Sequence, residues 1–294
     1  SPLFLQIGFP GPHPPYDPTP EALAPYADRE VPLQPVTAED LSNQPKAYQG
    51  MRVHNHEVDH DSVVHLLDPT EEQRKDQRRH YLANMTMIDT KVGEILESLE
   101  AQGYLENSVV VFTSDHGDCL TDHGHSQKWT MYEQVTRVPL IVWAPDGRFG
   151  DGGRKIDDLV SLFDVGPTLL ELAGCEVPGH FAAKSLVPAL ESDPEWSGRD
   201  CVFAEHPRDG NFTTADYQTM VRTRDWKLVR IDGSDALDGE SEGLLFDLVN
   251  DPGEQRNRWD DPEAATEKAA LLERMLGWRL ETGRESAAWS APFR

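Results

Sequence analysis

Apolar positions at intervals of three and four residues mark the clearest helix of the chain. The pattern begins near Asp76, continues to Leu99, and is followed by Gly103, where a C-terminal cap belongs. The sequence therefore predicts a long helix over residues 76–99. Its apolar positions are Leu82, Met85, Ile88, Val92, Ile95, Leu96 and Leu99.

Continuous runs of β-branched and aromatic residues predict strands that are covered on both faces. Residues 108–113 and 138–143 are such runs, and residues 164–173 read as a capped helix. The apolar run of residues 3–9 predicts a further buried strand, ending in a proline-rich loop. Strands and helices in alternation are typical of a largely parallel sheet flanked by helices.

The pattern changes near residue 197, where short strands are followed by one helix. The helix starts at Asp261 and runs through Leu280. We expect residues 1–196 to belong to a large α/β domain and residues 197–294 to form a small C-terminal α+β domain of antiparallel strands and one helix. The predicted strands cover residues 201–204, 218–223 and 226–231, and the last two are linked as a hairpin through Arg224 and Asp225.

Residues 17–75 are rich in proline, acidic residues and histidine and have little periodicity, which predicts a long irregular excursion over the surface. We expect this excursion and the C-terminal segment to line a pocket mouth or a subunit interface. The run of residues 54–61 is dense in ligand-type side chains, but its spacing matches no zinc or EF-hand pattern. A solvated or subunit-contacting loop is therefore the preferred interpretation of this run.

Charge narrows the possible functions. The chain has 294 residues, with 27 Lys+Arg and 52 Asp+Glu, and a formal net charge of -25. This charge repels phosphodiester backbones and anionic membrane surfaces, so neither nucleic acid nor a membrane is expected as a partner. The apolar runs are far shorter than the ~20 residues that span a bilayer, which predicts no transmembrane helix.

The cysteines and the first residues bear on the compartment. Cys119, Cys175 and Cys201 are too few and too widely spaced for a disulfide framework or a zinc site, which favours a cytoplasmic location. The sequence begins at Ser1 without an initiator methionine or a signal-peptide pattern, so we expect that residues are missing before it. A signal peptide would lie in that missing part, so a periplasmic or secreted location stays open.

Candidate chemistry follows the predicted strand 108–113. Asp115 and His116 stand at its carboxyl end, where ligands bind in open α/β sheets, and a carboxylate and an imidazole suit a metal ion. The alternative is that Asp115 caps a turn and His116 bonds the backbone.

Further candidates are basic. Lys128 offers a compact positive charge to an anionic group, with a solvated lysine as the alternative. His13 lies in the proline-locked loop after the first predicted strand, where a fixed imidazole can serve acid catalysis or substrate contact. His123 and His125 are second-tier candidates, with structural roles as the alternative.

Taken in order, these features resemble the sulfatase branch of the alkaline-phosphatase superfamily. The resemblance covers nearly the whole chain and implies a mixed, mainly parallel sheet between helices. The similar segments are Phe9 to Tyr16, Ile88 to Asn107, Phe112 to Asp118, Lys128, Arg137 to Val142, Phe163 to Leu170, Leu245 to Leu248 and Asp251 to Glu254.

The resemblance also implies roles for these residues. Asp115 and His116 would hold one divalent metal, with Ca²⁺ as the first choice and Mn²⁺ or Mg²⁺ as alternatives. Lys128 would bind the sulfuryl or phosphoryl oxygens and the leaving-group oxygen, and His13 would assist departure of the alcohol. The Asp-His pair is similar to that of the choline-sulfatase, iduronate-sulfatase and phosphonate-monoester-hydrolase groups.

The chain departs from the family pattern in two elements that, in the family, precede the segment similar to Leu3 to Tyr16. One is an N-terminal strand that ends in paired aspartates, and the other is the motif of the nucleophile. Sulfatases use a formylglycine made from a Cys or Ser in a C/S-x-P/A-x-R motif, and no cysteine of this chain stands in one. We therefore expect the C-terminal portion of an enzyme that hydrolyses small sulfate esters, with the N-terminal portion as the partner that supplies formylglycine. One alternative is a phosphonate monoester or phosphodiester hydrolase. Another is a non-catalytic fragment that binds a metal or a partner. Assembly into a homo-oligomer stays open.

Overall fold

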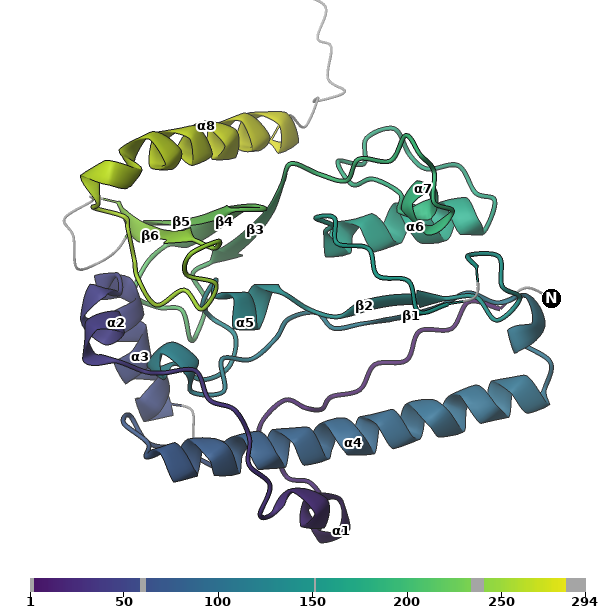
Figure 1. Ribbon diagram of the computed structural model, residues 1–294, viewed down its shortest axis with the longest axis horizontal. Helices are drawn as coiled ribbons and strands as arrows, with labels where there is room; N and C mark the ends of the chain where they lie inside the picture. The colour runs from purple at the N-terminus through teal and green to yellow at the C-terminus, as the bar shows by residue number, and fades with distance from the viewer. Residues whose placement is uncertain (1–2, 59–61, 151, 234–240, 284–294) are drawn as a thin grey trace, which may run out of the picture. The chain divides into compact units, whose positions relative to one another are not determined.

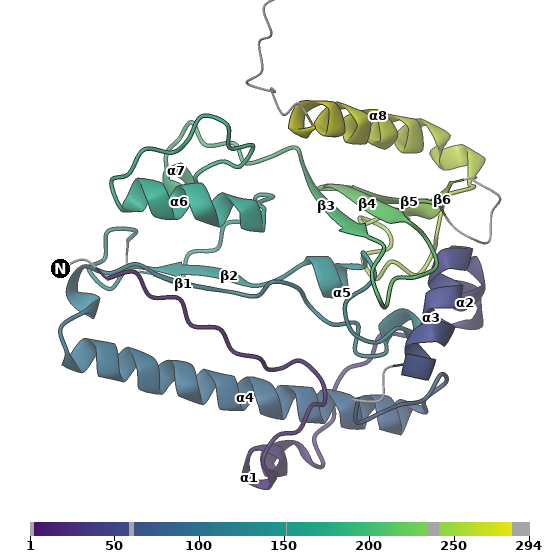
Figure 2. The same ribbon diagram turned by 180° about the vertical axis from the view of Figure 1, so that it is seen from behind.

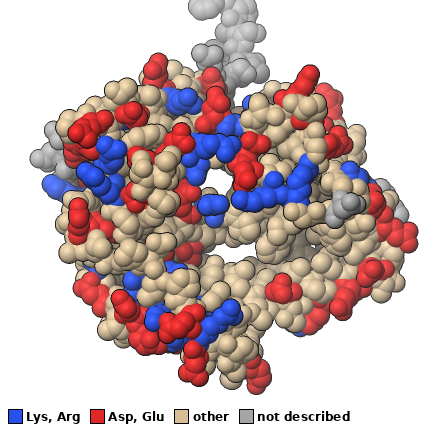
Figure 3. Space-filling view, viewed as in Figure 1, with Lys and Arg blue, Asp and Glu red and all other residues tan. Residues whose placement is uncertain are grey.

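The computed structural model describes residues 3–58, 62–150, 152–233 and 241–283. The chain forms two compact units, one of residues 1–152 with 209–214 and the other of residues 153–208 with 215–294 (Figure 1). The predicted domain boundary after residue 196 falls within the second unit and stays a prediction. On the face seen in Figure 3, basic side chains lie among acidic ones. None of the helices in the described ranges has both the length and the apolar character that a bilayer span requires.

The long predicted helix is confirmed as α4 (Glu71–Ala101). It starts earlier than the apolar pattern does because Thr70 and Gln73 form a capping box that holds the first turn. Gly103 follows the helix with a positive φ of 74°, as predicted for the end of the helix.

The strands of the first unit pair differently from the prediction. β1 (Val110–Thr113) and β2 (Leu140–Trp143) form a two-stranded antiparallel sheet, with Val110 opposite Trp143. The expectation of mainly parallel pairing is therefore wrong for the described strands. The connection between them contains only η3 (Asp122–Gly124) and the four-residue α5 (Glu133–Thr136), and it returns to the end of the sheet where it began.

The apolar run of residues 3–9 does not form the predicted buried strand. Leu3, Phe4, Leu5 and Ile7 are exposed, with Phe4 78% exposed, and none of the described strands pairs with this run. An apolar run by itself predicts burial, but a strand also needs a neighbour that satisfies its backbone hydrogen bonds.

The predicted irregular excursion contains helices. They are α1 (Pro20–Leu23), η1 (Ala24–Tyr26), α2 (Ala38–Asn43) and α3 (Lys46–Val58). In α3 the buried residues Ala47, Tyr48 and Met51 recur at helical spacing, so the signal was present among many polar residues. The histidine-rich run begins on α3, and residues 59–61 lie outside the described residues.

The second unit confirms the predicted antiparallel strands followed by one helix. Its sheet has the order β3-β4-β5-β6, and β4 and β5 form the predicted hairpin. Helix α8 packs on this sheet (Figure 2), where Val221, Leu228, Leu245, Leu271 and Met275 form the core. The remaining elements of the chain are η2 (Leu105–Asn107), η4 (Leu162–Asp164), α6 (Val165–Leu172), α7 (Val187–Leu190), β3 (Cys201–Pro207), β4 (Tyr217–Thr223), β5 (Trp226–Asp232), β6 (Glu242–Asp247), η5 (Pro262–Ala264) and α8 (Ala265–Thr282).

Candidate active site

Asp115 and His116 lie just beyond the end of β1, as predicted. The Asp115 side chain is 86% exposed, and its Oδ2 lies 3.6 Å from Nε2 of His116. The backbone N–H of His116 donates to Oδ1 of Asp115 at 3.0 Å, which fixes the carboxylate beside the imidazole.

The backbone also sets the orientation of the His116 ring. Nδ1 lies 2.8 Å from the carbonyl oxygen of Gly117, an acceptor, so Nδ1 carries the proton in this contact. In the neutral ring, Nε2 then presents a lone pair beside Asp115. A backbone carbonyl behind an imidazole is the usual support of a metal-ligating histidine, so the pair suits a divalent metal. Among the described residues, no group of three or more His, Cys, Asp or Glu side chains could hold a metal ion.

Gly117 is required by close backbone packing. A Cβ at this position would lie 1.9 Å from the carbonyl oxygen of Gln134, and the Gly117 N–H donates to the Val135 carbonyl at 2.8 Å. The glycine therefore lets the segment after Asp115 and His116 lie directly against α5.

The Asp118 carboxylate connects three segments that carry predicted site residues. It accepts hydrogen bonds from the Tyr16 hydroxyl at 2.6 Å, from the Leu120 N–H at 2.9 Å and from the Gln127 N–H at 3.1 Å. Tyr16 follows the loop of His13, and Gln127 directly precedes Lys128.

Desolvation raises the pKa of the Asp118 carboxyl, and the hydrogen bonds from Tyr16, Leu120 and Gln127 oppose that rise. The ring of Tyr81 packs edge-on against Tyr16, with centroids 6.0 Å apart. Burial, and then the charge of Asp118, raises the pKa of Tyr81 to about 12.

Helix α4 anchors the loop between Asp118 and Lys128. Arg74 and Arg78 both reach Oδ1 of Asp122, at 3.2 and 2.5 Å, and the Asp122 side chain is 4% exposed. The loop that precedes Lys128 is thus tied to the most regular element of the unit.

The two predicted basic residues, His13 and Lys128, each have an end of the side chain without a hydrogen bond to the described residues. His13 is exposed, and its Nδ1 lies 3.0 Å from the Pro14 carbonyl oxygen. Lys128 is half-buried and has no hydrogen bond or ion pair with any residue that the structure describes. An unpaired ammonium on an anchored loop can bind an anionic group without first breaking an ion pair.

His123 and His125 lie in the interior. The His123 ring is 0% exposed, stacks on Tyr132 with centroids 3.8 Å apart, and places Nδ1 3.1 Å from Oδ2 of Asp40. Burial, followed by the charges of His123 and Arg52, lowers the pKa of His125 to about 3. These contacts are those of packed interior side chains, whereas Asp115 is exposed.

Sequence reasoning assigned no role to Asp118 or Tyr16. Their contact joins residues 102 positions apart, and no local pattern indicates such a pairing. The only signal in the sequence was that both residues lie within segments of the family resemblance.

Comparison with known proteins gives two family matches. The family described as Sulfatase matches residues 1–175, and the family described as N-sulphoglucosamine sulphohydrolase, C-terminal, matches residues 121–281.

The chain is also similar to curated sulfatases. It is 32% identical to arylsulfatase K of Xenopus laevis, over 87% of the chain and 48% of the relative, and 29% identical to an arylsulfatase of Clostridium perfringens, over 97% and 54%. It is 31% identical to an N-acetylglucosamine-6-O-sulfatase of Bacteroides thetaiotaomicron, over 66% and 34%. The chain thus spans about half the length of the first two relatives and about a third of the length of the third.

Solved structures share the fold. The phosphonate monoester hydrolase of Silicibacter pomeroyi superposes with a TM-score of 0.78 and 25% identity, over 96% of this chain and 57% of that one. A 2-O GAG sulfatase superposes with a TM-score of 0.70 and 22% identity, over 92% and 59%. The fold class is therefore the predicted alkaline-phosphatase-like α/β fold, and the antiparallel pairs of this chain are part of it.

Proposed function

Because the chain belongs to the sulfatase family, we propose that it is part of an enzyme that hydrolyses sulfate esters. The proposal rests above all on the Asp118 carboxylate, whose hydrogen bonds connect the segments of His13, His116 and Lys128. The chain spans about half the length of its first relatives. The functions that its residues do not supply, the formylglycine among them, are therefore assigned to a portion of the enzyme outside this chain.

In this proposal Asp115 and His116 contribute two ligands to a divalent metal. The exposed carboxylate and the Nε2 lone pair beside it support this assignment. Sulfatases generally use a divalent metal and a formylglycine. We assign Ca²⁺ as the metal, with Mn²⁺ or Mg²⁺ as alternatives, and the formylglycine to the portion outside this chain. When bound, the metal would supply a Lewis acid that polarises the ester oxygens.

The two basic residues act on the same ester. The unpaired ammonium of Lys128 binds the sulfuryl oxygens and stabilises the charge that develops on them. His13 gives a proton from Nε2 to the departing alcohol. Its exposed imidazole, whose Nδ1 faces the Pro14 carbonyl and leaves Nε2 available, supports this role.

A second candidate function is hydrolysis of phosphonate monoesters. The structural similarity to the Silicibacter pomeroyi phosphonate monoester hydrolase favours it, because tetrahedral esters of sulfur and phosphorus place their oxygens alike. The ratio of kcat/KM for an aryl sulfate and an aryl phosphonate, measured on the complete enzyme, separates the two functions.

The test of the proposal is the Lys128→Ala variant of the complete enzyme. We expect kcat to fall by about 10²–10³, as when one donor that stabilises developing charge is removed. Lys155→Ala is the matched control, since that lysine is 78% exposed and pairs with Asp157 at the surface. An unchanged kcat in Lys128→Ala contradicts the assignment of Lys128.

A further inference from the structure

The loop of residues 119–127, which leads directly to Lys128, has a strained backbone. Four of the seven described non-glycine residues with a positive φ lie in it. They are Leu120 at 45°, Thr121 at 70°, His123 at 52° and Gln127 at 58°. A side chain with a Cβ disfavours this left-handed region, so such a conformation persists only where the surrounding structure holds it.

Two arginines of α4, Arg74 and Arg78, hold the first strained turn of the loop. Nε of Arg74 donates to Oγ1 of Thr121 at 2.9 Å, and its Nη2 donates to Oδ1 of Asp122 at 3.2 Å. Nη2 of Arg78 donates to the same carboxylate oxygen at 2.5 Å. The side chains of Arg74 and Asp122 are 8% and 4% exposed, so these charge-assisted hydrogen bonds form away from bulk water, where they are strong.

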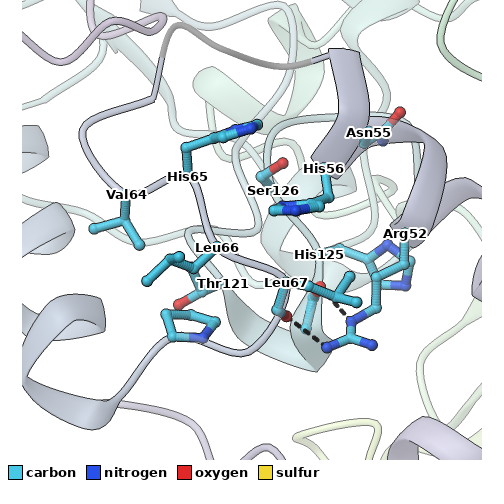
Figure 4. A pocket seen from close by; sticks show the side chains of 12 residues that line it. Arg52, Asn55, His56, Val64, His65, Leu66, Leu67, Thr121, His125 and Ser126 are labelled. Atoms are coloured by element: carbon cyan, nitrogen blue, oxygen red, sulfur yellow. Dashed lines mark hydrogen bonds between the residues drawn. The ribbon is translucent and has the colours of Figure 1, made fainter.

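Other side chains hold the middle of the loop. Nε2 of Gln44 donates to the carbonyl oxygen of His123 at 2.8 Å, and Nε of Arg52 donates to that of Gly124 at 3.0 Å (Figure 4). Arg74 instead binds the side chains of Thr121 and Asp122, next to the two consecutive left-handed residues. Its other contact is with the carbonyl oxygen of Gln34 at 2.7 Å, so the guanidinium is itself fixed in place.

The closed loop determines where Lys128 begins. The N–H of Cys119 donates to the carbonyl oxygen of Gln127 at 2.9 Å, so the first and last residues of the loop are bonded to each other. Lys128 follows Gln127 directly and has no hydrogen bond or ion pair with the residues that the structure describes. Since no contact of its own ammonium fixes Lys128, the backbone before it must set its place.

We propose that Arg74 is a positioning residue for Lys128. Resting on the proposed function, its guanidinium keeps the strained loop closed, so that the Lys128 ammonium lies where the sulfuryl oxygens bind. Arg74 is buried and acts only through the loop. A displacement of about 1 Å can lower a rate by about 10²-fold, so loss of this guanidinium should lower kcat although the ammonium is still present.

The first experiment measures the order of the loop in the chain itself, by ¹⁵N NMR relaxation of the Gln127 and Lys128 amides. We expect order parameters of about 0.85 in the wild type and below about 0.6 in Arg74→Met. Arg79→Met is the matched control, because Arg79 also lies on α4 and its side chain is 9% exposed. Its contacts are with Glu72 and the Arg29 carbonyl oxygen, outside the loop, so this variant should keep the order parameters of the wild type.

A second variant separates loop order from global stability. Arg74→Met combined with Asp122→Leu removes a buried cation together with its carboxylate, so the free energy of unfolding should recover much of the loss in the single variant. Arg78 can turn to water, since its side chain is 18% exposed. The loop stays unanchored in this double variant, so its Lys128 amide should remain disordered. Wild-type order parameters at Lys128 in either folded variant overturn the proposal.

The second experiment tests the proposal by a double-mutant cycle in the complete enzyme with an aryl sulfate. Arg74→Met should lower kcat by about 10–10²-fold and change KM less, because the Lys128 charge acts mainly in the transition state. In Lys128→Ala, the same substitution should change kcat by less than about 2-fold, since no ammonium is left to position. Arg79→Met should leave kcat unchanged in both backgrounds.

A merely structural role of Arg74 gives a different result. Loss of folded enzyme would lower kcat by the same factor with and without Lys128, and equal factors in the two backgrounds overturn the proposal. If the wild type hydrolyses no sulfate ester, the proposed function fails. The relaxation measurement then still decides whether Arg74 orders Lys128.

Discussion

Replacing Asp118 by alanine removes the acceptor of three hydrogen bonds at once. The Tyr16 hydroxyl, the Leu120 N–H and the Gln127 N–H all donate to this carboxylate. Tyr16 is 1% exposed and Gln127 is 7% exposed, so water has little access to their donors. Asparagine is the matched replacement, because its Oδ1 can accept from both N–H groups while its Nδ2 donates to the tyrosine oxygen.

The two variants should differ clearly in stability. Each donor left without an acceptor lowers the free energy of unfolding by about 1–3 kcal/mol. Removing the partly desolvated carboxylate offsets part of this, so Asp118→Ala should lower the free energy of unfolding by about 3–5 kcal/mol. Asp118→Asn exchanges charge-assisted hydrogen bonds for neutral ones and should lose about 1–2 kcal/mol.

Two measurements on the chain check this prediction. Urea unfolding gives the difference in the free energy of unfolding between the variants. Native-state hydrogen exchange of the Leu120 and Gln127 amides reports the two backbone contacts directly, with protection kept in Asp118→Asn and lost in Asp118→Ala. If alanine is tolerated as well as asparagine, or if both amides stay protected in Asp118→Ala, the carboxylate does not hold these segments together.

Three further perturbations test other parts of the structure. The pKa of His125 is lowered from 6.5 to about 3, so between these pH values the unfolded chain binds a proton that the folded chain does not. The free energy of unfolding should therefore fall by about 1.4 kcal/mol for each pH unit as the pH drops through this range. In His125→Gln, the slope of the free energy of unfolding against pH, measured by urea unfolding, should be smaller by the contribution of one proton. Lys227 and Glu254 form a 2.8 Å ion pair, and both side chains are 0% exposed. Lys227→Met should lower the free energy of unfolding by about 3–5 kcal/mol, because it leaves the Glu254 carboxylate buried without its cation. Adding Glu254→Leu should recover much of this loss, which a double-mutant cycle of unfolding free energies measures. Gly117→Ala should cost about 2–3 kcal/mol through its backbone clash, whereas Gly93→Ala, on α4 with open space around it, should be neutral or stabilising in the same thermal unfolding assay.

Local patterns determined the regular elements. The period of apolar residues and Gly103 defined most of α4, and two short strand-like runs joined through Arg224 and Asp225 defined the hairpin of β4 and β5. These features depend on interactions between residues close in sequence, so the sequence contains the information directly. The sequence also predicts Asp115, His116 and Lys128 as site residues, through their position after a strand and the family resemblance, and these roles stay predictions.

Tertiary structure decided the features that depend on distant partners. The run of residues 3–9 has the composition of a strand, but no described strand pairs with it. Strand direction in β1 and β2 depends on where the connecting loop returns, which the composition of the strands does not encode.

The site shows the same division. Asp118 gains its partner Tyr16 across 102 residues, and Nε2 of His125 contacts Oε1 of Gln44 across 81 residues. The sequence by itself therefore determined which side chains could do chemistry at the end of β1. Only the tertiary structure decided which of them are held together, because hydrogen bonds and burial between distant segments form no local pattern.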